Sequence, residues 1–178
     1  MQNGVFQTGN PRWSAVFSLF MGVMALIAAE FIPVSLLTPI ARDPAVTEGM
    51  AGQTVTAVGV FAVLTSLLLA PLTGTIDRRR ILLAFSAMLA ASYMLIGIAP
   101  TYPIMLIGRA ILGICVGGFW SLASAVTLQL VPTKDVPRAL SIVYAGVSVA
   151  TIIALPVASW IGHLIGWRNV FFLGALMA

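Results

Sequence analysis

Charged residues are scarce in this chain of 178 residues. Asp, Glu, Lys and Arg make up 8% of the sequence, whereas a soluble domain carries about a quarter. Nine Lys and Arg against five Asp and Glu give a net charge of +4, but consecutive arginines at positions 78–80 supply much of it. Because nucleic-acid binding needs a basic face with groups that read or stack on bases, this clustering argues against a nucleic-acid partner.

Disulfides and catalytic motifs are also missing. The single cysteine, Cys115, excludes an intramolecular disulfide framework. The sequence contains no HExxH pair, no GxSxG segment and no pair of carboxylates within a long apolar run, which are patterns typical of hydrolytic enzymes. We therefore expect no enzyme activity, no catalytic residue, no metal site and no cofactor.

Long apolar runs, by contrast, fill most of the chain. Hydrophobic residues make up 60% of it, and the mean hydropathy is +1.07. A helix needs about 20 apolar residues to cross a hydrocarbon core of about 30 Å. Five runs are long enough, and they cover about 13–41, 49–76, 81–99, 104–133 and 138–165.

Prolines and glycine divide these runs. Pro100 and Pro103 separate the third run from the fourth, because proline removes a backbone donor and biases the preceding residue away from helix. A sixth helix opens at 166–168 and stops at Ala178, too short to cross. The sequence therefore predicts an all-α, polytopic membrane protein with five full spans and a truncated sixth.

Loop charges predict the orientation in the membrane. The segment before the first span is short and carries only Arg12, so this span is not expected to be a cleaved signal peptide. The second-to-third and fourth-to-fifth loops sum to positive charge, whereas the first-to-second loop sums to −1. By the positive-inside rule, we expect a cytoplasmic segment at 1–12, a membrane bundle at 13–178 and a location in the cell inner membrane.

Three segments resemble the major facilitator superfamily. Residues 74–80 read Gly-Thr-Ile-Asp-Arg-Arg-Arg and are similar to the charged loop between helices two and three of that family. Residues 106–113 contain its Arg-x-x-x-Gly pattern of helix four, and residues 166–168 read Gly-Trp-Arg, as at the start of its sixth helix. The resemblance implies a bundle that forms the N-terminal six-helix half of a twelve-helix transporter.

Shorter segments are similar to the drug:proton antiporter branch of that family, with its arabinose-efflux-like permeases, and above all to its purine ribonucleoside exporters. They read Glu-Phe-Ile-Pro-Val-Ser-Leu-Leu at 30–37, Ala-Gly-Gln at 51–53, Gly-Gly-Phe-Trp at 117–120 and Gly-Trp-Arg-Asn-Val-Phe at 166–171. This resemblance implies proton-coupled efflux of a small polar solute, foremost a purine nucleoside or related compound. The implied partners are that solute, protons, the lipid bilayer and a C-terminal six-helix half absent from this chain.

Two other functions stay open. Sugar or drug efflux would use the same fold. A truncated membrane fragment with a structural or regulatory role and no transport of its own would also fit a chain that ends within its sixth helix. Substrate-dependent flux separates this last alternative from transport.

Glu30 and Arg109 are the candidate site for proton coupling and substrate. Each is the only charge in its apolar run, and a charge at membrane depth costs about 2.5–3.5 kcal/mol on insertion scales and usually lines a polar pathway. Counted from the outer ends of their helices, their depths differ by only a few ångströms at about 1.5 Å per residue. We expect them to meet across a cavity, with a structural ion pair as the alternative.

Further candidates surround this pair. Four aromatic residues offer stacking surfaces to a purine, unless they only pack: Phe31, Phe119, Trp120 and Tyr144. The resemblance assigns a conformational latch to the charged loop, whose alternative is a plain stop-transfer cluster; its residues are Gly74, Asp77, Arg78, Arg79 and Arg80. Pro156 predicts a bend in the fifth helix, and the spacing Gly113-x-x-x-Gly117 predicts close helix packing.

Overall fold

The chain folds into a bundle of helices. The computed structural model describes residues 11–35, 47–73 and 77–178, which form helices and short connections with no strand. The expected segment at 1–12 lies almost wholly outside these residues, as does Gly74. The elements are α1 (Trp13–Ser35), α3 (Glu48–Thr73), α4 (Arg78–Ile98), α5 (Tyr102–Leu130), η1 (Thr133–Asp135), α6 (Val136–Val149), η2 (Ala150–Ala154), α7 (Leu155–Ile165) and α8 (Trp167–Met177).

Five helical stretches in the described residues are long and apolar enough to cross a membrane. They are Trp13–Val34, Gly52–Leu69, Arg78–Ile98, Tyr102–Leu130 and Thr133–Ile165. The last of these joins η1, α6, η2 and α7 into one span, and α8 follows with eleven residues. The prediction of an all-α, multi-pass membrane protein with five full spans and the beginning of a sixth is confirmed.

Local chemistry explains where the helices begin and end. The Asp77 side chain accepts a hydrogen bond from the Arg79 N–H at 3.0 Å and so caps the N-terminus of α4. Pro103 lies in the first turn of α5, where a missing N–H costs nothing. Gly166 separates α7 from α8 with φ = 88°, a conformation that glycine adopts without steric penalty.

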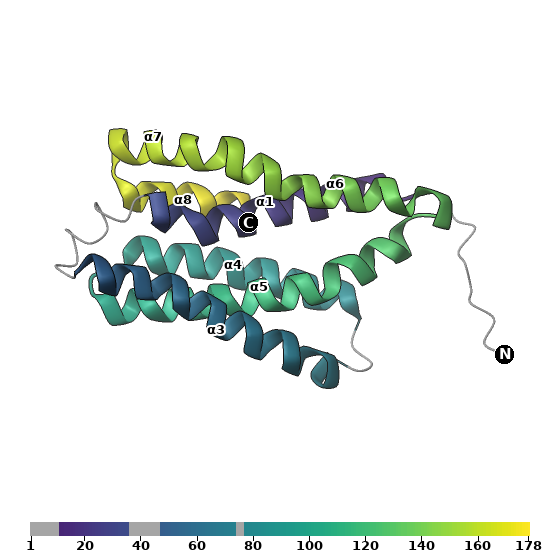
Figure 1. The fold of residues 1–178 in the computed structure, drawn as a ribbon, viewed down its shortest axis with the longest axis horizontal. Helices are drawn as coiled ribbons and strands as arrows, with labels where there is room; N and C mark the ends of the chain where they lie inside the picture. The colour runs from purple at the N-terminus through teal and green to yellow at the C-terminus, as the bar shows by residue number, and fades with distance from the viewer. Residues whose placement is uncertain (1–10, 36–46, 74–76) are drawn as a thin grey trace.

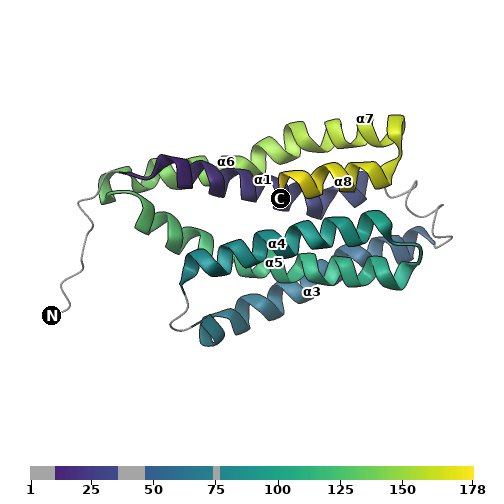
Figure 2. The same ribbon diagram turned by 180° about the vertical axis from the view of Figure 1, so that it is seen from behind.

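A π-helical turn interrupts the fifth span. It covers Ala150–Ala154, directly before Leu155 and Pro156 at the start of α7. The Leu155 N–H donates to the Ala150 carbonyl, five residues earlier. The proline ring leaves no room for an ordinary hydrogen bond in the preceding turn, and the wider turn relieves that conflict. Figures 1 and 2 show α6 and α7 meeting there with an offset between their axes.

The helices form two layers, visible in both views (Figures 1 and 2). One layer holds α1, α6, α7 and α8, and the other holds α3, α4 and α5. Within the layers α1 packs on α6 and α5 packs on α3, while α4 packs on α8 between them. Chain order relates the two layers, because the first, fifth and sixth spans form one layer and the second, third and fourth spans form the other.

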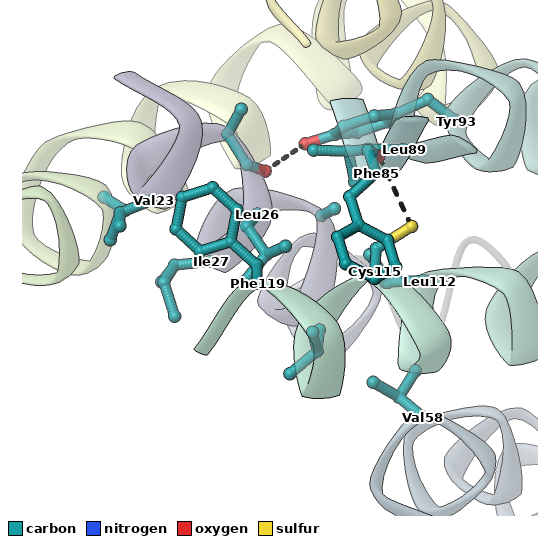
Figure 3. Packing of buried hydrophobic residues seen from close by; sticks show 14 of the residues in the cluster. Val23, Leu26, Ile27, Val58, Phe85, Leu89, Tyr93, Leu112, Cys115 and Phe119 are labelled. Carbon is teal, nitrogen blue, oxygen red and sulfur yellow. Dashed lines mark hydrogen bonds between the residues drawn. The ribbon is translucent and has the colours of Figure 1, made fainter. Parts of the chain in front are cut away.

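Glycines allow a close approach between α5 and α3. A Cβ atom on Gly113 would lie 2.5 Å from the Val58 carbonyl oxygen, and one on Gly117 would overlap the Ala62 carbonyl. The buried core continues from this seam through Leu112 to α1 (Figure 3). Small residues every fourth position are a usual means of helix association in membranes.

We expect Gly117→Ala to destabilise the bundle by about 1–3 kcal/mol, because the added methyl group meets backbone that cannot move without separating the helices. Gly59→Ala is the matched control, since Gly59 lies in α3 with nothing within 4 Å of its added Cβ. Both changes gain the helix propensity of alanine. Thermal unfolding in detergent measures the difference, and equal midpoints would contradict this packing role.

Candidate functional site between α1 and α5

The guanidinium group of Arg109 joins α5 to the backbone of α1. The side chain is fully buried. Its Nη1 donates to the Ala29 carbonyl oxygen at 2.7 Å, and its Nη2 donates to the Glu30 carbonyl oxygen at 2.9 Å. Charged donors make stronger hydrogen bonds than neutral ones, so these two bonds fix α1 against α5 at the depth of Glu30.

Pro33 explains why Arg109 finds an acceptor on a helix. In a regular helix the N–H of residue 33 would donate a hydrogen bond to the carbonyl oxygen of Ala29, four residues earlier. Residue 33 is a proline inside α1 and has no N–H. A buried carbonyl left without a hydrogen-bond donor costs about 1–3 kcal/mol. Arg109 therefore supplies the donor that α1 itself lacks.

The carboxylate of Glu30 is not the acceptor of either bond. Arg109 uses the main-chain oxygen of this residue, while the Glu30 side chain is half-buried. The structure thus brings the two predicted residues together, but through the backbone of α1. This arrangement differs from a carboxylate–guanidinium lock, because the carboxyl group of the half-buried Glu30 takes no part in either bond.

Two neighbouring polar side chains of α4 bond this helix to α1 and to α5. The Tyr93 hydroxyl of α4 donates to the Ala25 carbonyl oxygen of α1 at 2.8 Å, one turn from the Arg109 contact (Figure 3). The Ser92 hydroxyl donates to the Gly108 carbonyl oxygen of α5 at 2.8 Å. Because α4 is bonded to α1 and to α5 near Arg109, the site has a rigid frame.

The Arg109 Nε is the exception in this network. It is buried and has no hydrogen-bond partner among the described residues. A buried donor of a charged group normally has a partner or an ordered water. The site therefore has one hydrogen-bonding position beyond those that the backbone of α1 fills.

The four candidate aromatic residues lie in different surroundings. Phe119 is buried, with its ring against Gly22 of α1, whereas Phe31 is 37% exposed. Trp120 of α5 and Tyr144 of α6 stack on each other, with ring centroids 5.7 Å apart and planes 9° from parallel. The structure thus brings together only Trp120 and Tyr144 of this set as a ring pair.

A cavity of about 680 Å³ opens where α1 and α4 begin and α5 ends. Pockets for small ligands commonly measure about 300–1,000 Å³. Three residues of the charged loop, Asp77, Arg78 and Arg79, lie at its lining, and Phe119 lies there too. Arg80 is exposed outside it.

Sequence reasoning missed Pro33 and Tyr93 as parts of the site. A proline in the middle of an apolar run was a usable signal for Pro33, since it frees the carbonyl four residues earlier in a helix. Nothing in the sequence distinguished Tyr93, because a hydroxyl that bonds to another helix depends on tertiary packing. Within the described residues no group of His, Cys, Asp or Glu gathers that could hold a metal ion.

Comparison with known proteins places this architecture in a family. The family model described as Major Facilitator Superfamily matches residues 13–178. The chain is 48% identical over 159 residues to "Transcription regulatory protein OpdE" of Pseudomonas aeruginosa, covering 89% of this chain and 40% of that protein. It is 46% identical over 167 residues to "Purine ribonucleoside efflux pump NepI" of Shigella sonnei, covering 94% and 42%.

A third relative carries the same name as the second and matches the chain to a similar extent. "Purine ribonucleoside efflux pump NepI" of Salmonella paratyphi B is 45% identical over 167 residues, which again covers 94% of this chain and 42% of that protein. The chain thus spans about two fifths of the length of the curated relatives that it matches, in their N-terminal part. With its helical architecture and a family match over residues 13–178, the chain belongs to the Major Facilitator Superfamily.

Proposed function

We propose that this chain is the N-terminal half of a proton-coupled exporter of purine nucleosides or related compounds. The observation that carries this proposal is the half-buried Glu30, whose main-chain oxygen accepts a hydrogen bond from the fully buried Arg109, within a helix long and apolar enough to cross a membrane. An ionisable group in that position is a candidate for a proton pathway. Relatives named as purine ribonucleoside efflux pumps support the solute class.

The geometry supports a role for each of these two residues. Arg109 holds α1 through the Ala29 and Glu30 carbonyls, which keeps the Glu30 side chain at a fixed depth. Glu30 binds and releases the proton as the protein changes the side to which its cavity opens. Coupling then arises because protonation and substrate binding favour different conformations.

A second candidate function is a regulatory membrane protein without transport. The relative that is 48% identical carries the name of a transcription regulatory protein, which favours this reading. Sugar or drug export by the same fold is a third.

Flux measurements separate these functions. In sealed vesicles that contain the full-length gene product, labelled guanosine should move faster than in vesicles without it, and unlabelled nucleosides should compete. Competition by sugars or cationic drugs alone would assign a different solute. The absence of flux for every solute, with correctly inserted protein, would favour the regulatory function.

We further propose that the N-terminus is cytoplasmic and that the protein lies in the inner membrane. Lys134 in η1 and Thr101 before α5 are both exposed and lie at opposite ends of α5. In intact cells Thr101→Cys should react with an impermeant thiol reagent and Lys134→Cys should not. The native Cys115 is buried and gives little background. The reverse pattern would invert the topology.

Asp77 is proposed to bias the conformational change through its charge. Asn caps a helix about as well as Asp, so Asp77→Asn should keep the cap on α4 but remove the charge beside Arg78 and Arg79 in the cavity. We expect nucleoside flux to fall severalfold at unchanged membrane abundance. Unchanged flux would leave Asp77 as a helix cap and a topology signal.

A further inference from the structure

Trp120 and Tyr144 form a ring pair between two helices that diverge. The helices α5 and α6 meet at η1 and spread apart from there (Figures 1 and 2). Trp120 lies ten residues before the end of α5 and Tyr144 eight residues after the start of α6, which places the pair about 12–15 Å from the junction. The rings thus span the gap between these helices.

The geometry of the pair leaves ring surface available. Near-parallel rings with centroids 5.7 Å apart are too close to admit a third ring between them, since contacting carbon atoms lie about 3.5–4.0 Å apart. Tyr144 is nonetheless 43% exposed. Part of Tyr144 outside the stack is therefore open to contact with a further group.

A hydrogen-bonding group lies at the edge of the same surface. The hydroxyl groups of Ser124 and Tyr144 are 2.9 Å apart. Two hydroxyls hold two donor hydrogens, and their mutual bond uses one. The stack thus combines an aromatic face with a donor and with acceptor lone pairs.

The pair also lies on the same side of α5 as Arg109. Trp120 follows Arg109 by eleven residues, which is three turns with about 20° of rotation and about 16 Å of rise. Arg109 points at α1, so Trp120 lies on the α1 side of α5, nearer the end where α5 meets α6. The two features occupy successive depths along one helix face.

Packing directs Tyr144 away from the core of its own layer. The face of α6 against α1 buries Ala139, Val143 and Gly146, and a Cβ on Gly146 would lie 2.8 Å from the Phe20 carbonyl oxygen. Tyr144 lies about 100° around the helix from Val143. The Tyr144 side chain therefore lies beside the face of α6 that packs on α1, where its ring stacks on Trp120.

We infer that Trp120, Tyr144 and Ser124 form a subsite that binds the base of a purine nucleoside. The base stacks on the exposed face of Tyr144, and the Ser124 and Tyr144 hydroxyls bond to its edge. A two-ring purine covers more of the stack than a one-ring pyrimidine does, so the subsite selects for purines. The inference rests on the proposed function, because it assumes that the solute is a nucleoside.

Equilibrium binding to the purified full-length gene product tests this subsite, with guanosine and uridine as probes. Tyr144→Leu should weaken guanosine binding about tenfold, and Ser124→Ala or Tyr144→Phe about threefold. The preference for guanosine over uridine should fall with Tyr144→Leu. Trp160→Leu is the control, since Trp160 of α7 is 66% exposed away from this pair, and it should leave both Kd values unchanged.

The outcomes distinguish the two proposals. A wild-type protein that binds neither nucleoside would refute the proposed function and this subsite with it. If the wild-type protein binds guanosine but folded Tyr144→Leu leaves the Kd unchanged, the subsite alone is refuted. The same holds if folded Tyr144→Phe and Ser124→Ala both leave the Kd unchanged. Thermal unfolding identifies folded variants, and the two milder changes decide the result if Tyr144→Leu fails to fold.

Discussion

Glu30→Gln should abolish efflux driven by a pH gradient in the full-length gene product. The amide keeps the shape of the carboxyl group but cannot take up or release a proton. Arg109 bonds to the main-chain oxygen of this residue, so the change leaves the contact between α1 and α5 intact. Gradient-driven flux should fall to the level of vesicles without the protein, because a coupled exporter without its titrating group has no path for the driving ion.

Two controls make this result specific. Nucleoside binding by Glu30→Gln should persist in part, and its thermal midpoint should stay close to that of the wild type, because neither hydrogen bond from Arg109 to α1 uses the carboxylate. Glu30→Asp keeps the titrating group and should retain measurable gradient-driven flux. Full gradient-driven efflux by Glu30→Gln would assign proton coupling to another residue.

Arg109→Ala should impair stability, substrate binding and transport together. The change leaves a buried cavity and removes both donors to α1. The Ala29 carbonyl then has neither the guanidinium nor an N–H from Pro33, and an unsatisfied buried group costs about 1–3 kcal/mol. Arg109→Lys retains the charge but not the forked pair of donors, so it should recover only part of the loss.

The double variant Arg109→Ala/Pro33→Ala separates structure from function. Replacing Pro33 by alanine introduces an N–H that can serve the Ala29 carbonyl within α1. We expect this second change to restore part of the thermal stability lost in Arg109→Ala, with a coupling energy of about 0.5–3 kcal/mol in the double-mutant cycle, but no transport. Additive effects of the two changes would contradict the link between Pro33 and Arg109.

Much of the fold was predictable because single-residue chemistry decides it. The lengths of the apolar runs predicted five spans, and Pro100 with Pro103 predicted the break between α4 and α5. These features depend on the cost of placing backbone and charges in a bilayer, which is independent of tertiary contacts.

Other features could not be predicted because they depend on which helices become neighbours. The Gly113 and Gly117 spacing predicted a close approach but not that α3 would be the partner. Pro156 predicted a disturbed helix but not the π turn at Ala150–Ala154. Glu30 and Arg109 were predicted to lie at one depth, yet the bond to the backbone of α1 follows from a contact between residues 80 positions apart in the sequence.

The most direct test of the proposed coupling measures protons while nucleosides provide the driving force. Proteoliposomes with the full-length gene product are loaded with guanosine and a pH-sensitive dye, then diluted into medium without guanosine. Coupling by antiport predicts that guanosine leaving the lumen draws protons in, so that the luminal pH falls with wild-type protein and stays constant with Glu30→Gln. Guanosine efflux at a constant luminal pH in the wild type would contradict proton-coupled export.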